Sequence, residues 1–192
     1  MTDDTGRGDT RARIQWVALE LFTEQGYEAT SLREIAERLG VTKAALYYHF
    51  KSKDEIVESI VDDQGAAVAQ LLEWAHTQPR TVKARQEFLR RYSDILFDRR
   101  HHLVMRFFER NQAALRGLPA GEKIRERMGR LLDVIVDRGA PPTQQIRAGV
   151  ALWALHASWF VIRDPAVSDE ERRQAALEVA LDLMTTVSRT PA

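Results

Sequence analysis

Cysteine is absent from this sequence of 192 residues. Without a thiol, the chain forms no disulfide, has no thiolate nucleophile and offers no cysteine ligand to a metal. The sequence also lacks the apolar core of a signal peptide near its N-terminus, and no run approaches the roughly 20 apolar residues that a membrane span needs. We therefore expect a soluble, cytoplasmic protein that does not associate with a membrane.

An excess of charge of either sign is also missing, because lysine plus arginine and aspartate plus glutamate both total 28. A neutral chain has no overall field that would attract nucleic acid. One stretch differs. From Arg38 to Lys53 the chain contains the basic residues Arg38, Lys43, Lys51 and Lys53 and no acidic residue. Contact with a polyanion is therefore expected there.

The alternating pattern of a half-buried strand is not found either, whereas apolar residues recur with helical spacing almost throughout. The sequence therefore predicts an all-α fold of about nine helices. Glycine and proline residues separate the later periodic segments, and they place helices near residues 81–97, 101–116, 122–137, 143–163 and 168–188.

Two of the predicted N-terminal helices flank a pair of very short ones. The first is expected to begin after Thr10, its N-cap, and to stop at Gly26. The fourth starts at Ser52, with Glu55 as its capping partner, and extends toward His76.

The short second and third helices have clear start and stop signals. Ser31 and Glu34 form the capping box of the second helix, which ends at Gly40, and Thr42 can cap the third. Gly40 can adopt the positive φ of a tight turn. Two short helices joined so closely must cross steeply, as in a helix-turn-helix. The alternative is that they are two core helices of an ordinary bundle.

The outward face of the third helix carries the expected chemistry. With Leu46 and Phe50 inside, the start of this helix would face base edges in a major groove. Lys43 can donate to guanine O6 and N7, and methyl groups can meet a thymine methyl. The expected groove residues are Lys43, Ala44, Ala45 and Tyr47; the expected phosphate contacts are Thr30, Ser31, Tyr48, His49 and Lys53.

The segment from Thr10 to Val57 resembles the N-terminal domain of the TetR family of transcriptional regulators, most specifically in LYYHFKSK at residues 46–53. The resemblance implies a three-helix DNA-binding head and a helical C-terminal domain that dimerises and holds a small-molecule pocket. It also implies repression that the ligand relieves. Carried over by position, it implies groove contacts from Arg33, Lys43, Ala44, Ala45 and Tyr47, phosphate contacts from Thr30, Ser31, Tyr48, His49 and Lys53, and a cap and further contact at Thr42. Many relatives have glycine or a hydroxyl residue in place of Ala44 and Ala45, which affects base preference rather than role.

The expected domains are residues 1–55, which bind DNA and of which 1–9 are disordered, and residues 56–192, which bind ligand and dimerise. Residues 148–162 are apolar on nearly every face of a helix, so the helix should be buried all round, partly against a second subunit. The alternative is a monomer that buries it entirely. The expected dimer residues are Val150, Ala154, Ala157, Val161, Ala176, Val179, Ala180, Leu183 and Val187.

Aromatic and large apolar residues of the C-terminal part are candidates for a ligand cavity, with core packing as the alternative for each. His156 is of special interest as a polar group in an apolar helix, although a backbone carbonyl could satisfy it. The candidates are Trp74, Phe88, Tyr92, Leu96, Met105, Phe108, Leu131, Trp153, His156 and Trp159.

Catalytic motifs are incomplete. Glu73 and His76 have the Glu-x-x-His spacing of a di-metal bundle, but no second copy exists. GLPAGEK at residues 117–123 lacks the spacing of a phosphate loop. We expect no enzyme activity, no metal and no cofactor. The sequence predicts a repressor that binds a pseudo-palindromic operator as a homodimer and is released by a partly apolar inducer. The alternative is an all-α ligand carrier or enzyme with an incidental helix-turn-helix-like head.

Overall fold

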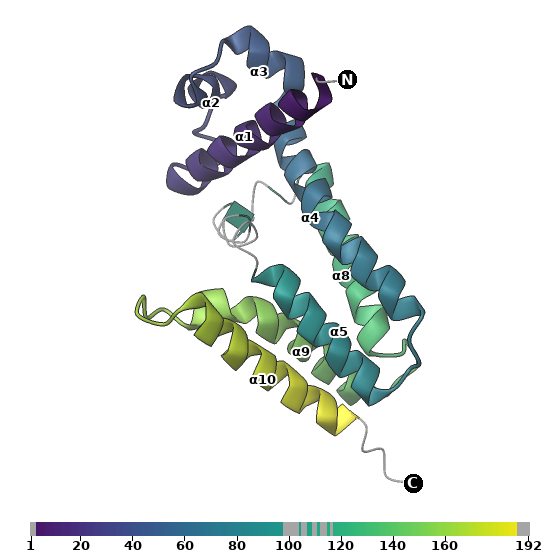
Figure 1. Cartoon of the computed structure of the whole chain (residues 1–192). Helices are drawn as coiled ribbons and strands as arrows, with labels where there is room; N and C mark the ends of the chain where they lie inside the picture. The colour runs from purple at the N-terminus through teal and green to yellow at the C-terminus, as the bar shows by residue number, and fades with distance from the viewer. Residues whose placement is uncertain are drawn as a thin grey trace. The chain divides into compact units, whose positions relative to one another are not determined.

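The computed structural model describes residues 3–97, 104, 107–108, 111, 115 and 117–187 (Figure 1). Over these residues the chain forms eight α-helices and no strand, which confirms the all-α prediction. The helix predicted near residues 101–116 falls mostly outside the described residues. The helices are α1 (Asp3–Glu24), α2 (Leu32–Leu39), α3 (Lys43–His49), α4 (Lys53–His76), α5 (Val82–Leu96), α8 (Pro119–Ile135), α9 (Pro142–Val161) and α10 (Asp169–Val187).

The chain packs as two compact units. One comprises Met1–Gln64 and Arg100–Arg125, and the other comprises Gly65–Arg99 and Glu126–Ala192. Both α4 and α8 are therefore divided by packing, whereas the functional boundary at residue 55 stays a prediction. Among the helices that the structure describes, none is long and apolar enough to cross a membrane.

Helix α1 is longer than the sequence predicted. It begins at Asp3 and not after Thr10, so residues 3–9, expected to be disordered, continue the helix. Its predicted stop is confirmed, because α1 ends at Glu24 and Gly26 takes a φ of 95° in the left-handed region. A residue with a Cβ would be strained at this position.

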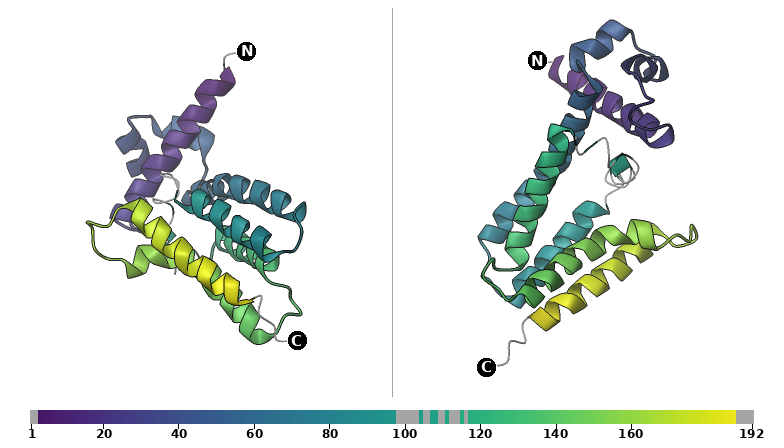
Figure 2. Two further views of the ribbon diagram at one scale, coloured as in Figure 1. Left: turned by 60° about the horizontal axis from the view of Figure 1, so that its bottom comes forward. Right: turned by 180° about the vertical axis from the view of Figure 1, so that it is seen from behind.

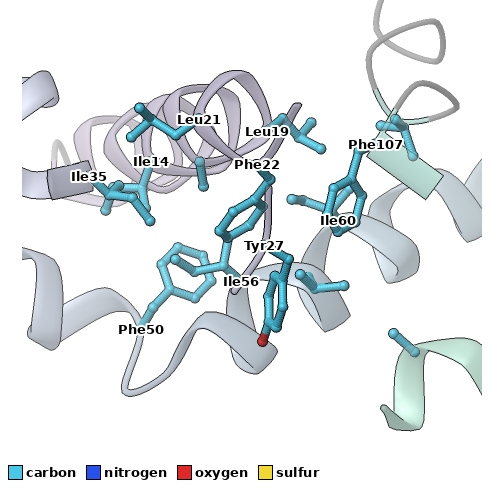
Figure 3. Close-up of a cluster of buried hydrophobic side chains, with 14 of the residues drawn as sticks. Ile14, Leu19, Leu21, Phe22, Tyr27, Ile35, Phe50, Ile56, Ile60 and Phe107 are labelled. Atoms are coloured by element: carbon cyan, nitrogen blue, oxygen red, sulfur yellow. The ribbon is translucent and has the colours of Figure 1, made fainter. Parts of the chain in front are cut away.

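The core of the first unit surrounds the fully buried ring of Phe22 on α1 (Figure 3). Ile14 of α1, Ile35 of α2 and Ile56 of α4 are also completely buried in this cluster. The Tyr27 ring lies 5.1 Å from that of Phe22, measured between centroids. Helices α1, α2 and α4 thus share one small core that orients the helix-turn-helix.

A segment distant in the sequence completes this core. The Phe107 ring is fully buried, with its centroid 5.4 Å from that of Phe22. Phe108 is partly buried against the same cluster. The first unit therefore contains Phe108, which the sequence placed among the candidates for a ligand cavity in the C-terminal part.

The second unit is built around α5, α9 and α10. Helices α9 and α10 are consecutive, antiparallel and side by side in both views (Figure 2). Leu89 of α5 and Leu155 of α9 are fully buried between the helices, and Ala180 of α10 is fully buried with them. The inward faces of these helices therefore form a core within this unit.

Gly65 lies inside α4, which continues through it to His76. A Cβ built at Gly65 would clash with the guanidinium group of Arg127 on α8. The absence of a side chain at residue 65 leaves room for this guanidinium group, which is the flexible end of a long side chain, so the glycine does not fix the packing of the two helices.

Candidate functional site

Reciprocal hydrogen bonds define the start of α2. The Ser31 hydroxyl accepts a hydrogen bond from the Glu34 amide at 3.2 Å, and the Glu34 carboxylate accepts one from the Ser31 amide at 2.7 Å. Hydrogen bonds from the Ser31 hydroxyl and amide lower the pKa of Glu34. The predicted capping box is therefore confirmed.

The turn between α2 and α3 is closed by Gly40. Its φ of 74° is left-handed, and its amide donates to the carbonyl groups at the end of α2. Thr42 then caps α3, because its hydroxyl accepts a hydrogen bond from the Ala45 amide at 3.1 Å. Leu46 and Phe50 are fully buried. The predicted turn, cap and inward face of the third helix are all confirmed.

The outward side of this helix-turn-helix contains most of the predicted DNA-contacting residues. Lys43 lies over the Tyr47 ring, with its Nζ 5.4 Å from the centroid. Arg33 pairs with Glu37 at 2.7 Å on the exposed surface of α2. The predicted residues that are exposed are Ser31, Arg33, Thr42, Lys43, Ala44, Ala45 and Tyr48, and those that are partly buried are Tyr47, His49 and Lys53.

Thr30 is a correction to the predicted contacts. Its residue is only 2% exposed, and its hydroxyl donates to the carbonyl of Gly26 at 2.8 Å. The same hydroxyl accepts a hydrogen bond from the Gln25 side chain at 3.2 Å. Thr30 therefore closes the loop before α2 and does not present its hydroxyl to a phosphate. The Ser31 hydroxyl is exposed but donates to Glu34 at 2.8 Å.

Lys53 has a structural contact that the sequence did not predict. Its Nζ donates to the carbonyl of Tyr27 at 2.6 Å and lies 4.4 Å from the centroid of the Tyr27 ring. The Tyr27 hydroxyl in turn donates to Asp54. Burial and this carboxylate raise the pKa of Tyr27 well above its ordinary value. Lys53 and Asp54 thus hold the start of α4 against the loop that precedes α2.

Asn111 is a second residue that sequence reasoning missed. It is 8% exposed, and its side-chain oxygen accepts a hydrogen bond from the Tyr27 amide at 2.8 Å. Its side-chain nitrogen donates to the carbonyl groups of Phe22 and Phe107. Asn111 therefore satisfies backbone groups at the end of α1. A single polar residue so far along the chain gives no local signal of this role.

The predicted ligand residues do not share one cavity. Trp74 and Phe88 line a cavity of about 310 Å³ at the ends of α4 and α8 and the start of α5. Trp159 stacks on Phe97, with 5.0 Å between ring centroids, whereas Trp153 is 60% exposed. Met105 lies outside the described residues. Tyr92, Leu96, Leu131 and His156 are buried in the core of the second unit, and Phe108 packs in the first.

His156 is satisfied by a side chain and not by the backbone carbonyl that the sequence suggested. Its Nε2 lies 3.0 Å from the hydroxyl of Tyr92 on α5. Burial lowers the pKa of His156 to about 4 and raises that of Tyr92. The pair is therefore neutral at physiological pH and links α5 to α9.

The cavity at residues 72–88 and 130–134 includes cations that the sequence analysis did not select. Arg80, Arg85 and Arg130 line it together with Asp133. The signal was an arginine-rich stretch from residue 80 onward, which also fits an ordinary solvated helix face. Only the folded chain distinguishes Arg85, whose side chain is 17% exposed, from its exposed neighbours.

The predicted dimer residues differ widely in exposure. Ala176 and Ala180 are 6% and 0% exposed and pack inside their own unit, so their assignment to a subunit interface is corrected. The alternative of a monomer that buries the whole apolar helix is also wrong, because α9 exposes apolar side chains. Val150, Val161 and Val179 are exposed, Ala154, Ala157 and Leu183 are partly buried, and the side chain of Val187 lies outside the described residues.

No group of three or more histidine and carboxylate side chains that could hold a metal ion occurs in the described parts of the chain. Glu73 and His76 are both exposed on the last turns of α4.

Comparison with known proteins identifies the N-terminal part. Residues 16–60 match the family of bacterial regulatory proteins described as the tetR family. The HTH-type transcriptional regulator AcrR of Shigella flexneri is 50% identical over 52 residues, which are 27% of this chain and 24% of that protein. The HTH-type transcriptional repressor Rv3405c of Mycobacterium tuberculosis is 40% identical over 68 residues, 35% of this chain and 36% of that protein. This chain therefore matches only about a quarter to a third of the length of these relatives.

Similarity to solved structures extends over most of the chain. The crystal structure of Mycobacterium smegmatis AmtR is 26% identical, with a TM-score of 0.64 over 91% of this chain and 85% of that one. A TetR-family transcriptional regulator from Bordetella parapertussis, 20% identical, has a TM-score of 0.67 over 90% of this chain and 94% of that one. At this low identity, the second match shows the fold alone.

Proposed function

We propose that this chain, which belongs to the TetR family of bacterial regulatory proteins, is a repressor that binds a pseudo-palindromic operator as a homodimer and is released by a small-molecule inducer. The observation that carries the proposal is the α2-turn-α3 unit. Leu46 and Phe50 anchor α3 in the core, so that Lys43, Ala44 and Ala45 face solvent at its start. A recognition helix presents these positions to a major groove.

Local charge supports binding to DNA by this face. The chain is neutral overall, yet residues 38–53 contain four basic and no acidic residues. Phosphate attraction decays within about 10 Å at ordinary ionic strength, so the charge near the contact matters more than the total. We assign base reading principally to Arg33, Lys43 and Tyr47. The methyl groups of Ala44 and Ala45 contact thymine methyl groups. The groove is flanked by Thr42, Tyr48 and His49. Ser31 donates to a phosphate when that phosphate replaces Glu34 as the acceptor of its hydroxyl.

An exposed apolar stripe supports the homodimer. Ile146, Val150, Trp153 and Val161 recur along one face of α9 and are 66%, 49%, 60% and 74% exposed. Val179 of α10 is 50% exposed. Monomeric soluble proteins rarely leave such contiguous apolar surface in water. A second copy of the same stripe would cover it in a two-fold contact.

The proposal is tested by footprinting and fluorescence anisotropy on the DNA that flanks the chain's own gene. We expect protection of two half-sites about one helical turn, roughly 34–36 Å, apart. Protection without two-fold symmetry would contradict the homodimer. An all-α ligand carrier or enzyme would bind no DNA sequence in preference to others.

A pair of matched variants locates the DNA-binding surface. Lys43→Glu reverses a charge on the outward side of α3, whereas Lys83→Glu makes the same change at an exposed position of α5. We expect the first to abolish operator binding and the second to leave it unchanged, since only the first places a carboxylate against DNA. Equal loss in both variants would contradict this assignment.

A further inference from the structure

The cavity of about 310 Å³ in the second unit lies between the end of α4, the start of α5 and the end of α8. Its volume is at the lower end of the range of roughly 300–1,000 Å³ for small-molecule sites. Leu72, Trp74, Phe88 and Val134 supply apolar walls. The cavity can therefore hold the apolar body of a small organic molecule.

The charged groups of this cavity favour an anion. Arg80, Arg85 and Arg130 line it, and Asp133 is the single acidic residue among the lining residues. Both oxygens of Asp133 accept hydrogen bonds from Arg138, at 2.9 and 2.6 Å, so its charge is compensated. Arg130 is exposed on α8. An excess of positive charge thus remains at the cavity.

Arg80 and Arg85 share one carboxylate outside the lining. Arg80 Nη1 donates to Asp137 Oδ1, and Arg85 Nη2 lies 3.3 Å from Asp137 Oδ2. A single carboxylate thus contacts two guanidinium groups, which leaves one positive charge uncompensated. Asp137 also orients the Arg85 guanidinium group through its contact with Nη2.

Arg85 is the most buried arginine of the cavity and contains a donor without a partner in the described part of the chain. This donor, Nε, is buried, and no hydrogen-bond partner for it occurs among the described residues. A buried N–H group without an acceptor is unfavourable, because it has lost water and gained nothing in return. Arg85 itself is largely buried, with 17% of its side chain exposed. A guanidinium group can bind a carboxylate through neighbouring N–H groups.

We propose that this cavity binds a small organic carboxylate with an aromatic or branched apolar body. Arg85 donates to the carboxylate from its guanidinium group, and the apolar body packs against Trp74 and Phe88. The apolar half of the lining favours such a compound over inorganic phosphate. Binding of the carboxylate does not depend on the proposed function, but its role as the inducer rests on that function.

Calorimetric titration of the full chain without DNA tests binding directly. The probes are benzoate, phenylacetate and 3-methylbutanoate, with methyl benzoate as the uncharged control and inorganic phosphate as the purely ionic one. We expect at least one carboxylate to bind with a micromolar to millimolar Kd and methyl benzoate to bind far more weakly. Absence of binding by all three carboxylates, or tighter binding of phosphate, would overturn the proposal.

Three variants assign the binding to Arg85. Arg85→Gln should raise the Kd of the bound carboxylate about 10- to 100-fold, the usual effect of losing a charge-assisted hydrogen bond. Arg85→Lys should retain the charge but lose the paired donors, which gives an intermediate Kd. Arg90→Gln removes an arginine of the same helix that does not line the cavity, and should leave the Kd unchanged. Equal effects of Arg85→Gln and Arg90→Gln would contradict the site, and circular dichroism verifies that each variant is folded.

Operator binding separates this inference from the proposed function. A carboxylate that binds the chain and weakens its operator complex supports both. If operator DNA binds but no carboxylate does, the repressor remains and the cavity assignment is wrong. If a carboxylate binds through Arg85 but no DNA sequence is preferred, the cavity assignment stands and the repressor is wrong.

Discussion

His156 combines burial with a titratable ring. Burial lowers its pKa to about 4, whereas a histidine in the unfolded chain titrates near 6.5. Between these two pH values the unfolded chain binds a proton that the folded chain does not, so stability falls as pH decreases from about 6.5 toward 4. Well above pH 6.5 this histidine is neutral in both states and contributes nothing to the pH dependence of stability. We expect its contribution to the loss to reach at most about 3 kcal/mol.

Urea unfolding at pH 7.5 and at pH 5 measures this effect. His156→Gln is the control, because glutamine can still exchange a hydrogen bond with Tyr92 but does not titrate. The difference in stability between the two pH values should be smaller in the variant. An equal difference in both proteins would show that His156 is accessible to protons in the folded state.

Lys43 and Lys53 should affect DNA binding differently. Lys43 is exposed at the start of α3, so Lys43→Ala should change base preference in a selection experiment. Lys53 is proposed to contact a phosphate, so Lys53→Ala should weaken binding to all sequences alike. Lys53 also donates to the Tyr27 carbonyl, so the same change should lower stability by about 1 kcal/mol. Selection on random DNA and thermal unfolding of both variants measure the two effects. The same shift of base preference in both variants would contradict this distinction.

The role of a residue could be predicted from the sequence when its hydrogen-bond partners were close to it along the chain. The caps at Ser31 and Thr42 depend on amides only three residues away, so the local pattern was sufficient. Thr30 was misassigned because its partners, Gly26 and Gln25, are in a loop whose shape no periodicity encodes. Asn111 was missed for the stronger reason that two of its partners, Tyr27 and Phe22, lie more than eighty residues away in the sequence.

The N-caps of α3 and α5 are chemically equivalent elements in different settings. Thr42 accepts from the Ala45 amide at 3.1 Å, and Thr81 accepts from the Ala84 amide at 3.2 Å. Either Thr→Ala change should cost roughly 1 kcal/mol of stability. Thr42→Ala should also weaken operator binding, since α3 has only seven residues and depends strongly on its first turn. Urea unfolding and fluorescence anisotropy measure the two effects separately.

The serine variants and the α5 cap provide the controls for this pair. Thr42→Ser preserves the hydroxyl acceptor and should retain most operator affinity. Thr81→Ala should reproduce the loss of stability without the loss of affinity. If both alanine variants bound the operator equally well, the cap of α3 would have no role in recognition beyond general stability.

At the scale of helices, the sequence predicted where each helix begins and ends better than it predicted what each helix face contacts. Apolar periodicity located α9 and α10 within a few residues, because periodicity records which positions avoid water. It could not decide which neighbour each face meets. Ala176 and Ala180 belong to the core of their own unit, whereas Val179, between them in the sequence, is exposed. The same limit left Arg85 indistinguishable from the solvated arginines around it.

For the molecule as a whole, we expect a homodimer formed through the exposed apolar stripe of α9. Val150 lies within the exposed apolar stripe of α9, so a homodimer through this face would bury residue 150 of both subunits. Val150→Glu would then place two carboxylates in an apolar contact, and we expect the dimer Kd to rise at least about a hundredfold. Ala69→Glu adds a carboxylate at an exposed position of α4 and should leave the dimer intact.

Light scattering gives the mass of each protein, and footprinting should show that Val150→Glu loses two-fold protection together with the dimer. A Val150→Glu chain with the mass and footprint of Ala69→Glu would exclude this face as the subunit contact.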